Sequence, residues 1–226
     1  MIWQDKGFLL LNNKYNENSS IAHFYTENNG KVVGTIFGAS SKKIKNYLLI
    51  GNKFHINSNL REDGKIGYFK VEIDEIKTPI FLENKKKLYC IIYTMSLLNI
   101  LTVENQKNKE IYQLIENFFE ILKNDVDKWL KNFVFWELNL FKCIGYDINF
   151  KNYVKRLNIE GVEKFIVENN QKVIPNFLIN KKNDPKNHDE IIKGFNIVGD
   201  FLDKTILKPN NITYPISRVE FVNLIK

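Results

Sequence analysis

The sequence predicts an α+β fold in which a small five-stranded β-barrel is followed by a mostly α-helical C-terminal domain. Up to about residue 83, short apolar runs that alternate with polar residues are separated by polar turns, a pattern typical of β-strands. After Pro79 the apolar residues recur at helical spacing over longer segments. We therefore expect two domains, 1–80 and 81–226, with the boundary between Ile76 and Lys85.

Five strands are expected in the first domain. Polar turns at Asn12–Asn18, Glu27–Gly30 and Arg61–Gly64 separate them. Five short, closely spaced strands favour a closed or nearly closed barrel over a parallel sheet, and five is the strand number of an OB-fold. We therefore predict an OB-type barrel over 1–80. The predicted strands are Gly7–Leu11, Ile21–Thr26, Lys31–Phe37, Gly51–Asn59 and Ile66–Ile73.

Apolar stripes at helical spacing predict five helices in the second domain. Gly145 ends one of these stripes, as glycine commonly does after the last turn of a helix. The stretch Phe150–Leu178 carries mixed signals, including those of a small hairpin around Asn169–Asn170. The predicted helices are Lys85–Val103, Lys109–Lys123, Asp125–Tyr146, Asp189–Leu207 and Ser217–Ile225.

Composition narrows the class of protein. The 226 residues carry a formal net charge of +7, with a pI near 9.1, which favours anionic partners such as nucleic acid or acidic protein tails. A chain rich in Lys, Asn and Ile is also what an AT-rich genome encodes, and the two explanations weigh equally. Cys90 and Cys143 lie in apolar stretches, which fits buried thiols in a reducing cytoplasm. No signal peptide is expected, and the apolar run Leu88–Val103 is too short for a membrane helix.

Recognisable catalytic motifs are absent from the sequence. His23, His55 and His188 are widely separated, and an ordinary structural role is favoured for the first two, which fall in predicted strands. No metalloprotease, nucleophile-elbow, P-loop or dinucleotide motif occurs, and no CxxC pair could build a four-cysteine zinc site. We therefore expect a protein that is not an enzyme. A nuclease or transferase would need a carboxylate or histidine cluster that only the fold assembles.

A run of lysines provides the strongest binding signal. From Lys31 to Lys53 the chain has five lysines and no acidic residue, and Gly38–Tyr47 follows a predicted strand directly. Glycine and serine let backbone amides approach a phosphate, while lysines and an aromatic ring supply counter-charge and a stacking surface. The alternative is a solvated lysine-rich loop. The predicted DNA-binding residues are Lys42, Lys43 and Lys45 as phosphate contacts, with Lys14, Lys31, Lys53 and Tyr47 as weaker candidates.

Two further basic groups carry weaker signals. Lys151 and Lys155, next to Arg156, would share one face of a helix if that segment is helical. A third group lies in the polar loop that follows. For both groups a solvated surface is the favoured interpretation. The members of the third group are Lys181, Lys182 and Lys186.

Several short motifs occur in a specific order along the chain. They are Trp3–Gly7, Asn16–Ala22, Thr26–Lys31, Gly38–Lys43, Gly51–Asn52, Phe135–Tyr146 and Tyr214–Phe221. In order and spacing, these motifs resemble those of the RecO family. Gly38–Lys43 resembles its Gly-x-x-basic segment, and Phe135–Tyr146 resembles its Phe-Glu-x-x-Leu-x-x-x-Gly-Tyr/Phe helix end. Tyr214–Phe221 resembles the ending of alphaproteobacterial members.

The resemblance implies an N-terminal OB-fold, a helical C-terminal domain and no catalytic residues. It implies binding of single- and double-stranded DNA and annealing of complementary strands. The implied partners are RecR and the acidic C-terminal tail of the single-stranded DNA-binding protein, with which family members help load the RecA recombinase. Many members hold zinc with cysteines after the Gly-Tyr helix end. Asp147–Val173 has no cysteine here, so neither a metal nor another cofactor is expected.

The residues and the resemblance together predict a cytoplasmic DNA-binding and annealing factor. The main alternative is an adaptor whose basic surface receives an acidic peptide tail and which binds DNA only weakly.

Overall fold

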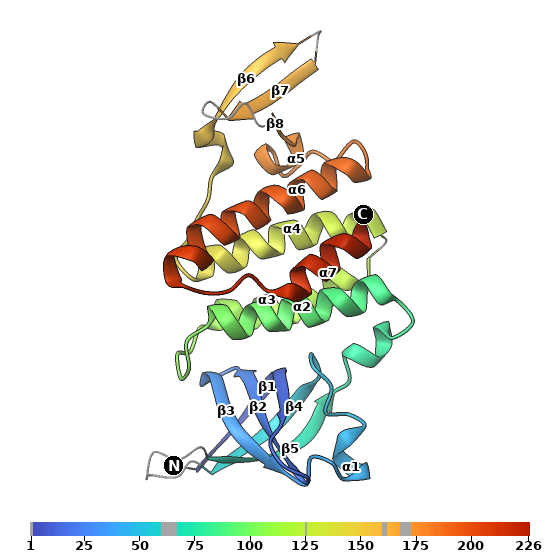
Figure 1. Ribbon diagram of the computed structural model, residues 1–226, viewed down its shortest axis with the longest axis vertical. Helices are drawn as coiled ribbons and strands as arrows, with labels where there is room; N and C mark the ends of the chain where they lie inside the picture. The colour runs from blue at the N-terminus through green and yellow to red at the C-terminus, as the bar shows by residue number, and fades with distance from the viewer. Residues whose placement is uncertain (1, 60–66, 125, 160–161, 168–172) are drawn as a thin grey trace. The chain divides into compact units, whose positions relative to one another are not determined.

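The chain folds into two compact units. The computed structural model describes residues 2–59, 67–124, 126–159, 162–167 and 173–226 (Figure 1). The first unit comprises Met1–Phe119 and Pro215–Phe221, and the second comprises Glu120–Tyr214 and Val222–Lys226. Within the described ranges, no helix has both the length and the apolar character that a membrane span needs.

Five strands of the first unit form a closed barrel with the neighbour order β1-β2-β3-β5-β4. All neighbours are antiparallel except β3 and β5. This five-stranded barrel is of the OB type and confirms the predicted fold. The expected turn Arg61–Gly64 lies outside the described residues. The strands are β1 (Ile2–Lys14), β2 (Ser19–Thr26), β3 (Gly30–Phe37), β4 (Lys53–Asn59) and β5 (Tyr68–Glu75), with the short helix α1 (Lys42–Lys45) between β3 and β4.

Strand β1 closes the barrel because it pairs along both of its edges. Residues 2–8 pair with β4 and residues 7–14 pair with β2. The register with β2 shifts between Leu9 and Leu11, an irregularity of the kind that bends a strand and increases its twist. One strand of 13 residues therefore joins both ends of the sheet. The sequence pattern predicted only its middle part, Gly7–Leu11.

Apolar side chains on alternate strand positions fill the barrel. The ring of Phe24 meets Phe54 at 5.6 Å and Phe69 at 5.9 Å between centroids, both edge-on. The other buried members of this core are Leu9, Ala22, Val32, Ile36, Leu48, Ile56 and Val71. Phe69 also lies over Gly34, where a Cβ atom would come within 2.6 Å of the ring. The core therefore requires glycine at this position.

Helices α2 (Lys85–Leu101) and α3 (Lys109–Leu122) cover the end of the barrel opposite α1 (Figure 1). Phe8 of β1 stacks on Phe119 at 5.9 Å and lies 5.6 Å from Tyr112. The start of α7 (Ile216–Ile225) also belongs to this unit, because Arg218 Nε donates to the Tyr93 hydroxyl at 3.1 Å. The compact unit therefore extends beyond residue 80, where the character of the sequence changes.

The second unit is built on the helices α4 (Val126–Cys143) and α6 (His188–Phe201). Phe133 of α4 stacks on Trp136 at 5.6 Å and lies 6.0 Å from Phe195 of α6. Asn187 caps α6, since its side chain accepts a hydrogen bond from the backbone of Glu190. The short helix α5 (Asn176–Ile179) precedes α6, and a π-helical turn, Leu202–Leu207, follows it.

A three-stranded antiparallel sheet occupies much of the stretch 150–178. Its strands are β6 (Val154–Ile159), β7 (Val162–Val167) and β8 (Val173–Ile174), in that order. The hairpin considered around Asn169–Asn170 lies outside the described residues. The condition for a shared helix face of Lys151 and Lys155 is not met, because Lys151 lies in a 3₁₀ turn and Lys155 lies in β6. Valines and isoleucines in this stretch favour extended backbone over a helix.

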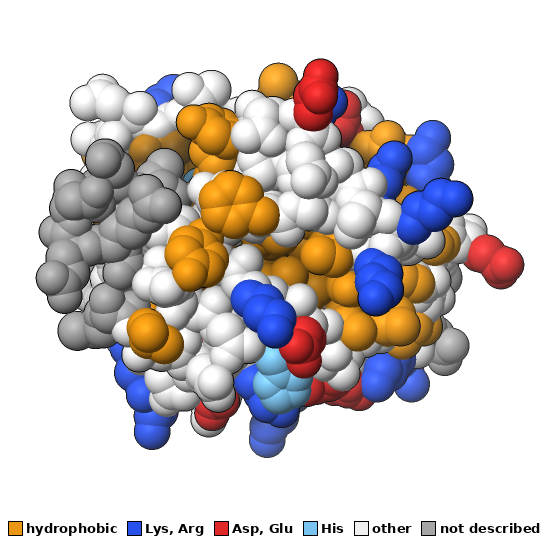
Figure 2. Space-filling model, turned by 90° about the horizontal axis from the view of Figure 1, so that it is seen from below, with side chains coloured by type: hydrophobic (Ala, Val, Ile, Leu, Met, Phe, Trp, Pro, Cys, Tyr) orange, Lys and Arg blue, Asp and Glu red, His pale blue; other side chains and the backbone are white. Residues whose placement is uncertain are grey.

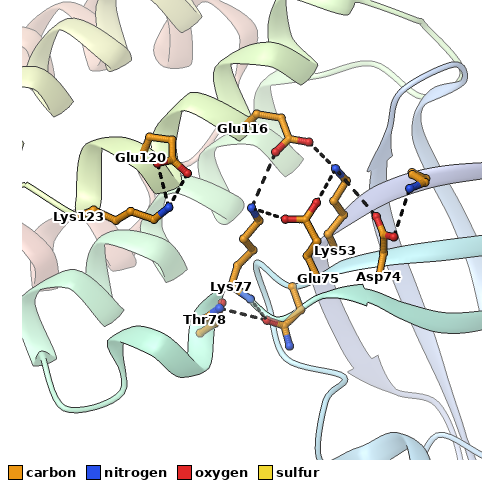
Figure 3. A network of polar contacts seen from close by, with 10 residues as sticks. Lys53, Asp74, Glu75, Lys77, Thr78, Glu116, Glu120 and Lys123 are labelled. Atoms are coloured by element: carbon orange, nitrogen blue, oxygen red, sulfur yellow. Dashed lines mark hydrogen bonds and ion pairs between the residues drawn. The ribbon is translucent and has the colours of Figure 1, made fainter.

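A cluster of charged side chains joins the barrel to α3 (Figure 3). Lys53 Nζ of β4 lies 3.0 Å from Glu75 Oε1 of β5 and 2.5 Å from Glu116 Oε1 of α3. Lys77 Nζ lies 2.6 Å from Glu75 Oε2 and 4.0 Å from Glu116 Oε2. Only 10% of the Lys53 side chain is exposed. The two carboxylates therefore compensate for the burial of its charge.

The pKa values of this cluster show how burial and ion pairing balance. Burial alone would lower the pKa of the Lys53 ammonium, but its hydrogen bonds with Glu116 and Glu75 outweigh burial and raise that pKa. The hydrogen bond from Lys77, joined by the one from Lys53, lowers the pKa of Glu75. Burial raises the pKa of Tyr112, whose ring centre lies 5.8 Å from Lys53 Nζ, to about 12. The lysine and the glutamate are therefore both charged at neutral pH.

Lys53→Ala is expected to lower the free energy of unfolding by about 2 kcal/mol. The change leaves Glu75 and Glu116 without their shared cation, and the figure is reduced from the ~3–5 kcal/mol of fully buried pairs because both carboxylates are partly exposed. Urea denaturation at neutral pH measures it. Lys6→Ala is the control, because Lys6 pairs with Asp74 from a side chain that is 44% exposed, and should cost less than about 1 kcal/mol. Equal losses in both variants would contradict the expectation.

The lowered pKa of Glu75 predicts a loss of stability in acid. A carboxyl whose pKa is lower in the folded chain stabilises the fold above its unfolded pKa, about 4.3. That contribution disappears as the pH falls through the folded value. The free energy of unfolding should therefore decrease from about pH 5 downward, and Glu75→Gln should flatten this decrease. Glu72→Gln, at an exposed position of β5, is the control. Parallel curves for Glu75→Gln and the unchanged protein would refute the assignment.

Candidate nucleic-acid interface

One helical turn, α1, presents three lysines at an end of the barrel. Strand β3 ends at Phe37, and Gly38 then turns the chain with a φ of +72°, in the region that favours glycine. Ile44, the apolar residue of α1, packs against the barrel core. Burial of Ile44 orients this turn, and the lysines around it remain exposed. These lysines are Lys42, Lys43 and Lys45.

The three α1 lysines are not neutralised by any carboxylate that the structure describes. None of them forms an ion pair with any residue in the described ranges. Figure 2 looks onto this end of the barrel and shows Lys and Arg side chains gathered on the side where α1 lies in Figure 1, next to hydrophobic side chains. Exposed, unpaired cations attract a phosphate backbone by releasing its bound counterions. The arrangement is therefore suited to an anionic polymer.

Lys14 joins this group through the fold. It is exposed at the end of β1 and, together with Lys45, lines a hollow of about 300 Å³. Ser40 also lines the hollow, and its hydroxyl donates to the carbonyl of Glu17 at 2.8 Å. This bond ties the segment before α1 to the turn between β1 and β2. The structure thus brings together lysines that are distant in the sequence.

Two weaker candidates from the sequence, Lys53 and Lys31, are held by neighbouring residues of the fold. Lys53 is buried in the cluster of Figure 3, with its ammonium held by Glu75 and Glu116. Lys31 Nζ donates to the carbonyl of Asn99 in α2 at 2.8 Å, and burial lowers its pKa. Both lysines are thus engaged by neighbouring elements of the fold. We therefore leave both out of the proposed DNA contacts.

The aromatic rings that are exposed on the barrel are not the ring expected to stack on bases, that of Tyr47. Tyr47 is half-buried against the barrel core, with its ring 6.3 Å from that of Phe54. Phe37 is 62% exposed, and its ring lies 6.0 Å from that of Tyr68 at the start of β5. The sequence itself indicates that Phe37 is exposed. Alternation along a strand places its side chain on the other face from the core residue Ile36. Its proximity to Tyr68 depends on the β3–β5 pairing, which local pattern does not reveal.

A second basic feature is a pocket of about 390 Å³ in the second unit. Its apolar lining includes Phe135, Leu138, Phe150, Leu178 and Ile179, and its lysines are Lys142, Lys151 and Lys181. Lys181 Nζ lies 5.4 Å from the centre of the Phe135 ring, and Lys142 Nζ lies 3.3 Å from Asp147 Oδ2. Lysines beside apolar side chains suit an anionic ligand with an apolar end. The fold thus places Lys151 and Lys181 at one pocket.

The three histidines lie in separate surroundings. His23 Nδ1 lies 2.7 Å from Asn99 Oδ1, and His55 Nε2 lies 2.7 Å from Asp74 Oδ1. His188 contacts a backbone carbonyl in the second unit. In the part of the chain that the structure describes, no three His, Cys, Asp or Glu side chains could hold a metal ion together. A cysteine zinc site does not fit this chain, since Asp147–Val173 contains no cysteine.

Comparisons with known proteins agree with the barrel and the motifs. The family model Recombination protein O N terminal matches residues 1–75, and Recombination protein O C terminal matches residues 82–194. A protein named DNA repair protein RecO from Rhodopseudomonas palustris (strain HaA2) is 23% identical over 242 residues, which cover 100% of this chain and 96% of the relative. A protein of the same name from Orientia tsutsugamushi (strain Ikeda) is 27% identical over 235 residues, which cover 96% of this chain and 95% of the relative.

Proposed function

The chain belongs to the RecO family of DNA repair proteins, and we propose that it is a non-catalytic mediator that binds single-stranded DNA and anneals complementary strands. The observation that carries the proposal is the exposed lysine group of α1, which pairs with no described residue, at one end of an OB-type barrel. Barrels of this type bind single strands through basic surfaces and aromatic rings. Phe37 and Tyr68 supply exposed rings on the same barrel.

The annealing mechanism in this proposal is electrostatic. Two complementary strands repel each other through their phosphates, and lysines that contact both strands reduce this repulsion. Base pairing then supplies the free energy of the product. The lysines bind the duplex through its phosphates, without reading its sequence. This mechanism requires no reacting side chain.

Two protein partners belong to the proposal, with different support. A RecR-like protein and the loading of a recombinase follow from family membership alone. For the acidic tail of a single-stranded DNA-binding protein, the pocket around Phe135 adds support from the structure. The same pocket favours a second candidate function, an adaptor that binds an acidic tail and has little affinity for DNA.

Reversing the charge of Lys42, Lys43 and Lys45 to glutamate should weaken binding of single-stranded DNA by about tenfold or more at moderate salt. The slope of log affinity against log salt should become shallower by about 2, since each lost phosphate contact removes about 0.7. Fluorescence anisotropy over a salt series measures both quantities. Addition of the complementary strand should show slower annealing.

The control for this variant reverses Lys85, Lys86 and Lys109, which changes the net charge by the same amount. These exposed lysines lie in the first turns of α2 and α3, where the helix dipole favours carboxylates. Binding should then remain close to that of the unchanged protein. An α1 variant that binds normally, or equal losses in both variants, would show that α1 is not the DNA contact.

Lys151→Glu with Lys181→Glu should weaken binding of a fluorescent acidic peptide with an apolar C-terminal residue by about tenfold, because two cations that line the pocket change sign. Binding of single-stranded DNA should change little. Lys182→Glu with Lys186→Glu is the control, because these exposed lysines lie in the same loop but do not line the pocket. If the unchanged protein binds the peptide and fails to bind DNA at low salt, the adaptor function replaces the mediator function.

A further inference from the structure

The hollow at the α1 end of the barrel has the size of a small ligand site. It lies between the end of β1, the start of β2 and the segment that leads into α1. Its volume of about 300 Å³ is at the lower end of the range for small-molecule pockets, ~300–1,000 Å³. The lining residues that matter here are Asn12, Lys14, Glu17, Ser20, Ala39 and Lys45.

Buried polar atoms at this hollow lack partners. Ser19 and Ser20 are each 4% exposed, and neither hydroxyl has a hydrogen-bond partner among the residues that the structure describes. The same is true of Asn12 Oδ1. Proteins satisfy nearly all buried polar atoms, so each exception calls for an explanation. Two of these exceptions, Ser20 and Asn12, point to a bound group in the hollow that completes them.

Strand register shows which of these atoms face the barrel interior. Asn12 is paired with Ala22 across β1 and β2, and Ala22 is a fully buried core residue. Ser20 lies two positions before Ala22 on the same strand, so it shares the interior face with Ala22 and Asn12. Lys14 is paired with Ser20 and therefore stands on that face at the rim. Asn12 thus lies further along this face than the Ser20–Lys14 pair, in which Ser20 is buried and Lys14 is exposed.

The chemistry of the hollow matches a nucleobase better than a phosphate. Phosphate oxygens only accept hydrogen bonds, whereas Asn12 Oδ1 requires a donor. The carboxylate of Glu17 in the lining also opposes an anion inside. A base has apolar faces and an edge with both donors and acceptors. Ala39 and the methylene stems of Lys14 and Lys45 offer apolar contact, and the two ammonium groups suit phosphates outside.

We propose that the hollow receives one unstacked base of bound single-stranded DNA. Ser20 and Asn12 contact the edge of this base, while Lys14 and Lys45 contact the flanking phosphates. The inference rests on the proposed single-strand binding and adds a base contact to its phosphate contacts. A base inside a duplex is stacked and paired, so it cannot enter. The hollow therefore favours single strands over the annealed product and helps to release that product.

Ser20→Ala tests this proposal because it should affect folding and binding differently. Loss of a buried hydroxyl without a partner should leave the urea midpoint unchanged or raise it. Affinity for a short oligothymidylate should decrease about three- to tenfold, since the base loses a hydrogen bond. Affinity for an abasic strand of the same length and charge should not change. Anisotropy with both labelled strands measures the difference.

Ser58→Ala is the matched control. Ser58 is 1% exposed in β4, its hydroxyl likewise has no partner within the described ranges, and it does not line the hollow. It should show the same response in stability and no loss of affinity for either strand. Ala39→Leu is a second variant, because it adds apolar volume to the wall without changing charge. It should weaken binding of oligothymidylate and spare the abasic strand.

The outcomes separate this inference from the function on which it rests. Equal weakening of both strands would overturn the inference, because the hollow would then act on the backbone. Unchanged affinities in both hollow variants would also overturn it and indicate that only water fills the hollow. If the unchanged protein binds neither strand at low salt, the proposed function fails and the inference fails with it.

Discussion

Closure of the barrel through β1 is the constraint on which the rest of the first unit depends. A strand of 13 residues with a shift in register can pair with β4 along one half and with β2 along the other, which leaves the sheet without an open edge at β1. A closed barrel has a filled interior and two ends. Here α2 and α3 cover one end, and α1 with the β1–β2 turn borders the other (Figure 1). The candidate DNA surface is located at the end that the larger helices leave open.

The lysines of this unit fall into two physical classes. Lys53 and Lys77 are held by carboxylates at the helix-covered end, where their charges contribute to stability. Lys42, Lys43 and Lys45 pair with no described residue, so their charges contribute little to the stability of the fold. The formal net charge of +7 covers the whole chain and does not distinguish these two classes. Only the second class can release counterions from a nucleic acid.

The proposed DNA contacts are of two kinds, ionic contacts with phosphates and contacts with bases. Lysines attract any phosphate backbone, single or double, and do not distinguish the two. The proposed contacts at the exposed rings of Phe37 and Tyr68 and at the hollow beside Ser20 would take unstacked bases, which only single strands offer. Under the proposed function, both kinds of contact help the protein to hold single strands and then to release a duplex. The second unit has a separate basic pocket, for which we propose an acidic peptide tail.

From the sequence alone, the OB-type barrel, the helical second half and the lysines near α1 could be predicted. Apolar alternation and local charge are properties of neighbouring residues, and the chain displays them directly. The tertiary structure decided that Lys53 is buried among carboxylates, that Phe37 lies beside Tyr68 and that Lys14 meets Lys45 at one hollow. It also decided that the compact unit includes α2 and most of α3. These outcomes depend on which distant strands and helices become neighbours when the barrel closes. The local sequence pattern does not reveal these long-range neighbours.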